Sequence, residues 1–236
     1  MTKTPHDYRE LLGAGKWFSA LPAAFGQALL DAATLRVFAP GERLFARGDA
    51  PDGVYAVIDG AIRATGVGSD GKEAVLALVE PPQWFGEIAV FDGLARTHDA
   101  IAVVESKVVH VPSAPLAAML EANPRWWRDL ALLVTTKLRL AFVMMEDTAL
   151  LPLAPRVARR LVLMAEGYGE WADRSRRVVK VRQEVLGAMV SASRQSINQV
   201  LKELEARGVI KVAYGEIEIT DLAGLRAASE NGREEI

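Results

Sequence analysis

Residues 183–210 read QEVLGAMVSASRQSINQVLKELEARGVI and carry the strongest structural signal in the chain. Its apolar residues return at helical spacing in two blocks, and a polar break, Ser191-Ala192-Ser193, separates them. This pattern predicts two helices joined by a tight turn. Because the Ser193 hydroxyl can accept a hydrogen bond from an early backbone N–H of the second helix, we expect that helix to begin near Arg194.

The outer side of the second predicted helix carries groups that suit base edges, since Arg forks onto guanine and Gln onto adenine in the major groove. A helix-turn-helix whose second helix reads DNA is therefore indicated. From the two-helix pattern alone, an ordinary helical protein with a solvated polar face remains an alternative. The residues expected to face DNA are Ser193, Arg194, Gln195, Ser196 and Gln199.

The segment that follows the two helices favours a winged module. Gly208 stands where a helix-ending glycine is expected. Residues 209–220, VIKVAYGEIEIT, alternate around Tyr214-Gly215 as the strands of a short hairpin do. Helix, turn, helix and hairpin in this order are typical of a winged helix-turn-helix.

Length and composition predict two ordinary domains. The chain has 236 residues, half of them hydrophobic, which is enough for two cores. Its apolar runs are shorter than the roughly 20 residues of a membrane span, and its N-terminus does not resemble a signal peptide. We therefore expect a cytoplasmic protein without membrane partners.

The reactive residue types argue against redox, metal and enzymatic chemistry. The chain has no cysteine, which excludes disulfides and a cysteine-held iron–sulfur cluster. The three histidines, His6, His98 and His110, lack metal-ligand spacing, so we predict no metal site. Nucleophile and acid–base constellations are also missing from the pattern, and an enzyme is not expected.

Charge is distributed unevenly along a chain whose formal net charge is only −2. Residues 1–155 hold 14 Lys and Arg against 18 Asp and Glu, whereas residues 156–211 hold 12 against 6. Positive charge on the helix-turn-helix segment suits phosphate contacts. We expect a few of these candidates, rather than all, to lie near phosphate: Arg156, Arg159, Arg160, Arg174, Arg176, Arg177, Lys180 and Arg182.

The first half predicts a short helical lead-in, from Phe18 to Ala32, and then many brief strands punctuated by glycine. Such a rhythm is typical of an antiparallel sandwich or barrel that encloses a pocket. The predicted strands are Leu35 to Phe38, Arg43 to Ala46, Val54 to Ile58, Ala61 to Val67, Ala74 to Leu78, Ile101 to Val104 and Val108 to Val111.

One segment, residues 84–100, interrupts the strand rhythm. Gly86 to Ala89 can form a helical turn with free N–H groups, and Arg96 follows ten residues after Gly86. A helix start beside an arginine suits an anion, and Glu87 can accept from a sugar hydroxyl. The alternative is an ordinary ion pair of Glu87 with Arg96 on the barrel rim. The predicted effector-binding residues are Gly86, Glu87, Ile88, Ala89, Arg96 and Thr97.

Three motifs carry a resemblance to the CRP/FNR superfamily of bacterial transcription regulators: PGERLFARGDAPDGVYAVIDGAIR (residues 40–63), FGEIAVFDGLART (residues 85–97) and the stretch quoted first. The resemblance covers roughly Phe18 to Ile219. It implies an α+β chain with an N-terminal antiparallel β-barrel of the double-stranded jelly-roll kind, a long dimerisation helix and a C-terminal winged helix-turn-helix. It also implies RNA polymerase as a partner.

For the effector, the resemblance implies that Gly86 and Glu87 hold a ribose and that Arg96 and Thr97 hold a phosphate. Three departures weaken the match to cyclic-AMP binders: His98 replaces a small alanine, the loop before Arg96 is shorter by one residue, and residues 141–142, Ala-Phe, replace a Thr-Ser pair. We therefore expect a small anionic, cyclic nucleotide-like effector. A cyclic dinucleotide, or no effector at all, remains an alternative.

For the DNA, the family's reading residues map onto Arg194, Gln195 and Gln199, with Ser193 and Ser196 near phosphate. The best-known members have Glu and Arg where this chain has Gln195 and Gln199. We therefore expect the half-site to differ from theirs.

A long helix is expected from about Pro124 to Leu150, with proline at its first position. Apolar residues line more than one of its faces, so one face can cover the barrel while another meets a second copy. A buried helix without a partner is the alternative. A homodimer suits an inverted-repeat operator, whose half-sites lie about 34 Å apart. The predicted interface residues are Trp127, Leu130, Val134, Ala141 and Met144.

The prolines at 152 and 155 predict a hinge at residues 151–155, followed by a helix from Arg156 to Gly167 and a basic hairpin from Arg176 to Val181. The expected divisions are an effector domain, residues 1–122, the long helix, residues 123–151, and a DNA-binding domain, residues 152–236. An effector packed against residues 135–145 is expected to bias the spacing of the recognition helices.

Overall fold

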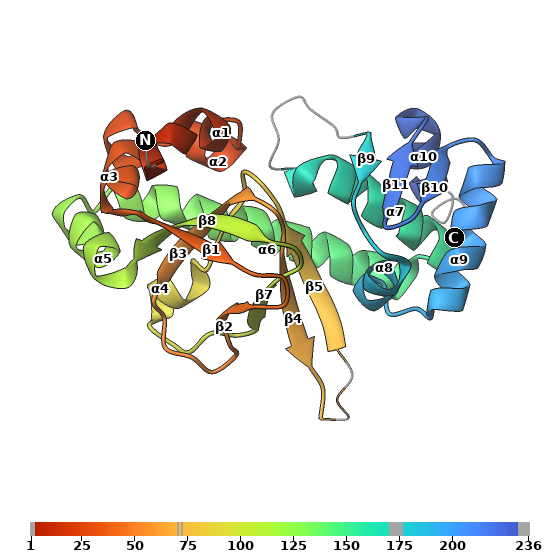
Figure 1. The fold of residues 1–236 in the computed structure, drawn as a ribbon, viewed down its shortest axis with the longest axis horizontal. Coiled ribbons are helices and arrows are strands. Elements are labelled where there is room, and N and C mark those ends of the chain that lie inside the picture. The colour runs from red at the N-terminus through yellow and green to blue at the C-terminus, as the bar shows by residue number, and fades with distance from the viewer. Residues whose placement is uncertain (1–2, 70, 72, 170–176, 231–236) are drawn as a thin grey trace. The chain divides into compact units, whose positions relative to one another are not determined.

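The computed structural model describes residues 3–69, 71, 73–169 and 177–230. The chain divides into two compact units, residues 1–138 and residues 139–236. The division falls inside the longest helix, α6 (Trp126–Leu150), rather than at either of its ends. Figure 1 labels the helices and strands of both units.

The first unit is built on two antiparallel four-stranded sheets in which most neighbouring strands are distant in sequence, as in a jelly roll. The predicted jelly-roll fold is confirmed, with the described strands forming two sheets rather than one closed ring. The first sheet has the order β1 (Thr34–Phe38), β8 (Ser106–Pro112), β3 (Gly53–Asp59) and β6 (Trp84–Phe85). The second has the order β2 (Arg43–Phe45), β7 (Asp99–Ala102), β4 (Ile62–Val67) and β5 (Glu73–Val79).

Strand β3 serves two cores because successive side chains of a strand point to opposite faces. Val54, Ala56 and Ile58 belong to a cluster that also contains the helices. Tyr55 and Val57 point the other way, into a second cluster formed with side chains of both sheets. A strand buried on both faces is continuously apolar, which is how residues 54–58 read.

The helices of the first unit pack on the outer face of the first sheet. Trp84 stands at this contact, stacked on Phe18 with ring centroids 5.7 Å apart and edge-on to Trp17 at 5.3 Å. These elements are the 3-10 helix η1 (Pro5–Tyr8) and the helices α1 (Arg9–Gly13), α2 (Lys16–Ser19), α3 (Ala23–Ala32), α4 (Ile88–Asp92) and α5 (Ser113–Ala122).

Several predicted boundaries were wrong. The lead-in is not one helix, because Pro22 caps α3 and separates it from α2. The strand predicted to end at Val104 ends at Ala102, and the side chains of Val103 and Val104 are exposed beyond it. Strand β6 was missed because a two-residue strand carries no periodicity.

Helix α6 begins at Trp126, two residues later than predicted, because Asn123 to Arg125 form a turn. Leu130 was predicted to face a partner, but it is only 1% exposed and packs in the core of its own unit. Sequence periodicity shows which faces of a helix are apolar, but it does not show which of these faces packs against the core. The large apolar side chains that stay exposed further along α6 include Leu138 (51%), Phe142 (60%) and Met145 (65%).

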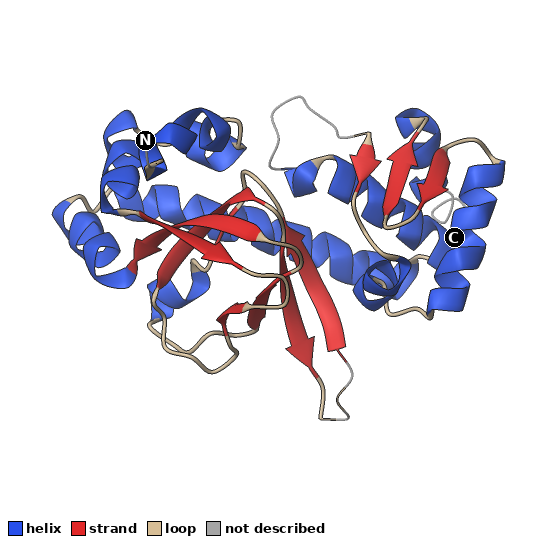
Figure 2. Cartoon of the chain, in the orientation of Figure 1, coloured by secondary structure: helices blue, strands red, loops and turns tan. Residues whose placement is uncertain are grey.

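The second unit contains the end of α6 and a winged helix-turn-helix (Figure 2). Its sheet has the order β10-β11-β9, in which β11 pairs antiparallel with both neighbours. The elements are α7 (Leu153–Ala165), the 3-10 helix η2 (Gly167–Gly169), β9 (Val178–Val179), α8 (Gln183–Met189), α9 (Arg194–Ala206), β10 (Ile210–Ala213), β11 (Glu216–Ile219) and α10 (Leu222–Glu230).

Two predictions about this unit need correction. Helix α7 begins at Leu153, so Pro155 lies within its first turn, where proline is tolerated. Leu151 and Pro152 alone separate α6 from α7. The predicted basic hairpin ending at Val181 is instead a single described strand, β9, paired with β11. Arg174 and Arg176 lie outside the described residues. In the part of the chain that the structure describes, no helix is long and apolar enough to cross a membrane.

Candidate effector site and DNA-binding surface

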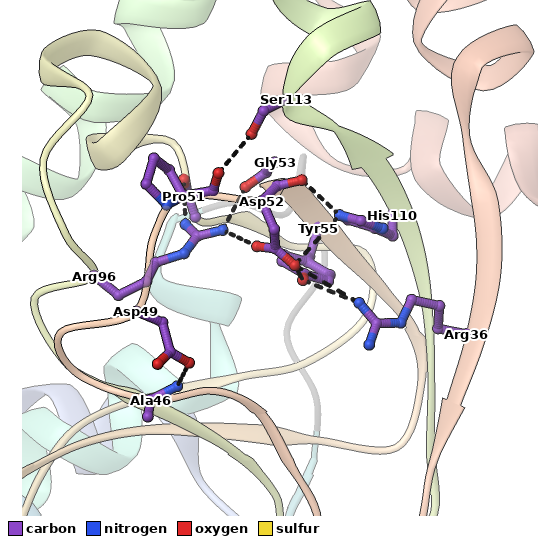
Figure 3. A network of polar contacts seen from close by, with 11 residues as sticks. Arg36, Ala46, Asp49, Pro51, Asp52, Gly53, Tyr55, Arg96, His110 and Ser113 are labelled. Atoms are coloured by element: carbon purple, nitrogen blue, oxygen red, sulfur yellow. Dashed lines mark hydrogen bonds and ion pairs between the residues drawn. The ribbon is translucent and has the colours of Figure 1, made fainter.

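Arg96 is the centre of the candidate effector site, and it is almost fully buried (Figure 3). Its Nη1 donates to the carbonyl oxygen of Gly86 at 2.8 Å, and its Nη2 donates to that of Gly53 at 2.7 Å. The guanidinium lies over the Phe45 ring, 4.2 Å from its centroid. Gly86 has φ +92°, and an added Cβ would lie 3.0 Å from Nη1, so glycine is required for this approach.

The charge of Arg96 is balanced by Asp52, whose Oδ1 accepts from Nη2 at 2.5 Å. The other carboxylate oxygen accepts from the Tyr55 hydroxyl and lies 3.7 Å from Nη1 of Arg36. Burial opposes ionisation of Asp52, but the hydrogen bonds from Tyr55 and Arg96 and the charge of Arg96 outweigh it. The pKa of this carboxyl therefore lies below its ordinary value.

The network continues through stacked rings to His110. The Tyr55 and His110 rings stack with centroids 4.4 Å apart, and His110 Nε2 lies 3.1 Å from the Asp52 carbonyl oxygen. Burial lowers the pKa of His110, and the carbonyl and charge of Asp52 offset this only in part. Burial, with the hydrogen bond to Asp52, raises the pKa of Tyr55.

Glu87 is buried and belongs to a separate ion pair. Its Oε2 lies 2.9 Å from Nζ of Lys137, which also donates to the Trp84 carbonyl oxygen at 2.7 Å. Among the described contacts, Glu87 and Arg96 do not pair with each other, so the simple rim ion pair between them is not formed. Lys137 joins α6 to this segment, within the range 135–145 that the sequence had singled out.

The remaining predicted residues differ in exposure. Helix α4 begins at Ile88, which is exposed, and Ala89 is buried. Thr97 is exposed, and its hydroxyl lies 2.8 Å from Nδ1 of His98. Burial lowers the pKa of His98. Among the described residues, no group of three or more His, Asp or Glu side chains is arranged to hold a metal ion.

Sequence reasoning missed Asp52, Tyr55, His110 and Lys137 as members of this site. Asp52 and Arg96 are 44 residues apart, and Lys137 lies 50 residues after Glu87. The available signal was the charge of Asp52 and Lys137 within mostly apolar segments, because buried charges such as those of Glu87 and Arg96 need partners.

The candidate DNA-binding surface lies on α9, which is positioned by its N-terminal cap and by its apolar stripe. Ser193 Oγ accepts from the Ser196 backbone N–H at 3.1 Å, as predicted. Ile197, Val200, Leu201 and Leu204 are buried. The predicted reading residues Arg194, Gln195 and Gln199 are exposed, whereas Ser196 is half-buried.

Two of the predicted reading residues have partners that the sequence did not suggest. Arg194 Nη1 lies 3.1 Å from Oε1 of Glu184 on α8. Gln199 Nε2 donates to Oε1 of Glu203 at 2.8 Å, one helical turn further along. These exposed contacts orient the two side chains while leaving them accessible to solvent.

The basic candidates separate into structural and exposed ones. Arg160 is buried and donates to the Met189 carbonyl oxygen at 3.2 Å, and Arg159 pairs with buried Asp147 at 2.8 Å. Arg156 donates to the Thr148 carbonyl oxygen at 3.2 Å. These three fasten α7 within the unit. The exposed candidates are Arg177, Lys180 and Arg182.

The wing follows the predicted pattern. Gly208 has φ +73° and ends α9, and Gly215 has φ +75° in the turn between β10 and β11. Tyr214, beside it, is fully exposed. A jelly-roll domain with a cyclic-nucleotide-type cassette, followed by a long helix and a winged helix-turn-helix, defines a class of DNA-binding transcription regulators.

Comparison with known proteins gives the family. A cyclic nucleotide-binding domain matches residues 35–123, and a Crp-like helix-turn-helix domain matches residues 155–228. The chain is 28% identical to a CRP-like cAMP-activated global transcriptional regulator of Mycobacterium tuberculosis, over 78% of this chain and 83% of that protein. It is 30% identical to the transcriptional regulator SdrP of Thermus thermophilus, over 76% and 85%.

A solved structure of a CRP/FNR-family regulator from Thermus thermophilus has a TM-score of 0.66 and 29% identity, covering 84% of this chain and all of that one. The chain belongs to the CRP/FNR family of DNA-binding transcription regulators. The relatives named here are regulators rather than enzymes.

Proposed function

We propose that the chain binds an inverted-repeat operator as a homodimer and that Arg194 reads one base of each half-site. The observation that carries this proposal is the capped helix α9, which presents Arg194, Gln195 and Gln199 on its exposed face. Arg177, Lys180 and Arg182 supply exposed positive charge in the same unit, as phosphate contacts require. Ser193 and Ser196 remain the proposed phosphate neighbours.

The proposed dimer seam is the exposed stripe of α6. Leu138, Phe142 and Met145 follow one another at spacings of four and three residues, which is the spacing of a coiled-coil seam. A single chain leaves these three large side chains in water, and such patches mark contact sites. Ala141 and the half-buried Trp127, Val134 and Met144 flank this stripe in the proposed interface.

The proposed effector is a small anion of the cyclic-nucleotide type. The matched cyclic nucleotide-binding domain and the named cAMP-activated relative support it. The ribose and phosphate residues, Gly86, Glu87, Arg96 and Thr97, are present, whereas the base-reading pair of the family is replaced by Ala141 and Phe142. RNA polymerase is the partner proposed from the family.

An effector-independent regulator is the second candidate, and one observation favours it. Both charged residues among the predicted effector-binding residues already have an opposite charge from the chain itself, Glu87 from Lys137 and Arg96 from Asp52. Operator binding measured with and without a panel of cyclic mono- and dinucleotides separates the two candidates. A change in affinity with any member supports the effector, and equal affinity with all of them supports independence.

Arg194→Ala tests the reading role. The operator is first selected from random DNA, and affinity is then measured by fluorescence anisotropy for the operator and its single-base variants. We expect a loss of about 1–3 kcal/mol, or roughly 5- to 150-fold, together with lost discrimination at one base position. Lys202→Ala, which removes an exposed positive charge from the same helix, is the matched control. Equal loss on every sequence would make Arg194 a phosphate contact, and failure to select any operator would refute operator reading.

A further inference from the structure

Arg96 is paired with a carboxylate of its own chain in the position where the proposed function needs a phosphate. The guanidinium makes three hydrogen bonds, to the carbonyl oxygens of Gly86 and Gly53 and to Oδ1 of Asp52. Only Asp52 among these partners carries charge. The two carbonyl groups orient the guanidinium, and Asp52 neutralises it.

The two side chains differ strongly in exposure, because Arg96 is 3% exposed and Asp52 is 42% exposed. The carboxylate is therefore the solvent-facing member of a pair whose cation is buried. A second anion that reaches the guanidinium meets the charge of Asp52 at short range, and like charges at such distances repel strongly in a partly buried site.

Arg96 retains donor capacity despite this pairing. Its Nε is buried and has no hydrogen-bond partner among the described residues. A guanidinium has five N–H groups, so an acceptor that arrives here finds free donors. Geometry thus favours an acceptor at Arg96, and charge opposes it as long as Asp52 stays in place.

Asp52 also has a second cation within reach. Its Oδ2 accepts from the Tyr55 hydroxyl and lies 3.7 Å from Nη1 of Arg36, and that Nη1 donates to the same hydroxyl at 3.2 Å. Figure 3 shows the carboxylate lying between the two arginines. A small rotation of the Asp52 side chain can therefore exchange Arg96 for Arg36 without leaving the carboxylate unpaired.

We infer that Asp52 is a built-in competitor for the Arg96 site, and that an anionic effector takes the guanidinium by transferring the carboxylate to Arg36. This inference rests on the proposed function, since it assumes an anionic effector at that cassette. It makes Asp52 and Arg36 determinants of affinity: Asp52 weakens anion binding, and Arg36 strengthens it by receiving the displaced carboxylate.

The test compares the full-length parent with Asp52→Asn, Arg36→Gln and the double variant Asp52→Asn/Arg96→Ala. Calorimetry measures binding of inorganic phosphate and of 3′,5′-cyclic AMP to each protein. Asp59→Asn is the matched control, because Asp59 is an exposed carboxylate of the same unit that pairs with Lys107 at 3.7 Å. We expect Asp52→Asn to bind anions at least about tenfold more tightly, equivalent to about 1.4 kcal/mol.

The other variants should not show this gain in anion binding. Arg36→Gln should bind cyclic AMP more weakly than the parent, the double variant should lose the gain, and the control should match the parent. If Asp52→Asn binds neither anion more tightly, or a gain survives in the double variant, the inference is wrong. If Asp52→Asn binds phosphate more tightly while none of the proteins binds cyclic AMP, the inference stands and cyclic AMP is excluded as the effector. If Asp52→Asn does not fold, unchanged binding by Arg36→Gln overturns the inference.

Discussion

Replacing Leu130 by alanine should destabilise the first unit without changing the association state of the protein. Leu130 is 1% exposed and packs in the core cluster with side chains from helices and from the first sheet. Truncating a buried leucine costs about 2–5 kcal/mol, because it loses the transfer free energy and leaves a cavity. At about 2 kcal/mol per molar urea, a loss of about 3 kcal/mol moves the unfolding midpoint down by about 1.5 M.

Leu138→Ala is the matched comparison, since it makes the same change on the same helix at a side chain that is 51% exposed. It should lower the free energy of unfolding of the unit by less than about 0.5 kcal/mol. It should also weaken the dimer, because Leu138 lies in the proposed interface. Tryptophan fluorescence reports the first unit well, because Trp17, Trp84, Trp126 and Trp127 all belong to or pack against its core. Both variants are studied at one protein concentration, because dimerisation contributes to apparent stability.

Sedimentation velocity then measures the association state of each variant. Leu130→Ala should unfold at a lower urea concentration than the parent and sediment like it. Leu138→Ala should unfold near the parental midpoint and sediment as a more weakly associated dimer. An unchanged midpoint for Leu130→Ala would contradict its place in the core. A monomeric Leu130→Ala beside a dimeric Leu138→Ala would return the interface to the face predicted from the sequence.

Two further predictions concern the cap and the histidines. Ser193→Ala removes the acceptor for the Ser196 N–H and should lower the free energy of unfolding of the second unit by about 1 kcal/mol, measured with urea. Ser193→Thr should restore most of this stability. Equal stability of all three proteins would exclude the cap. Burial holds the pKa values of His98 and His110 below their ordinary 6.5. As the pH drops from about 7 to 5, the unfolded chain therefore binds more protons than the folded chain, and the stability of the fold should fall. Melting temperatures across that range should show a smaller fall in His110→Gln and a still smaller one in His98→Gln/His110→Gln; parallel curves would refute this assignment.

The DNA-binding unit was the more predictable part of the chain because its signals are local. The Ser193 cap, the glycine that ends α9 and the two-residue turn at Tyr214-Gly215 each act within a few residues. The strands of the jelly roll were likewise predicted from brief runs punctuated by glycine. Strand β6 and helix α5 were missed, the first because it is too short for a pattern.

The candidate effector site was predictable only in part, because its contacts join distant segments. Gly86, Glu87 and Arg96 are close in sequence, but their partners Lys137 and Asp52 are not. The interface predicted on α6 includes Leu130, which the core of its own unit buries, because apolar residues on several faces of a helix do not indicate which face its own core covers. Arg160 counted as surface charge in the sequence, but the fold buries it.

The alternation of β3 links folding to chemistry. Its odd-numbered positions include Tyr55, which supplies the hydroxyl to Asp52, and its even-numbered positions hold the helical layer through Val54 and Ala56. Inserting or deleting a single residue here would exchange the two sets of side chains. Such an indel would destroy the Arg96 network even where the chain still formed a strand, so the length of this short segment is a condition for the proposed ligand recognition as well as for folding.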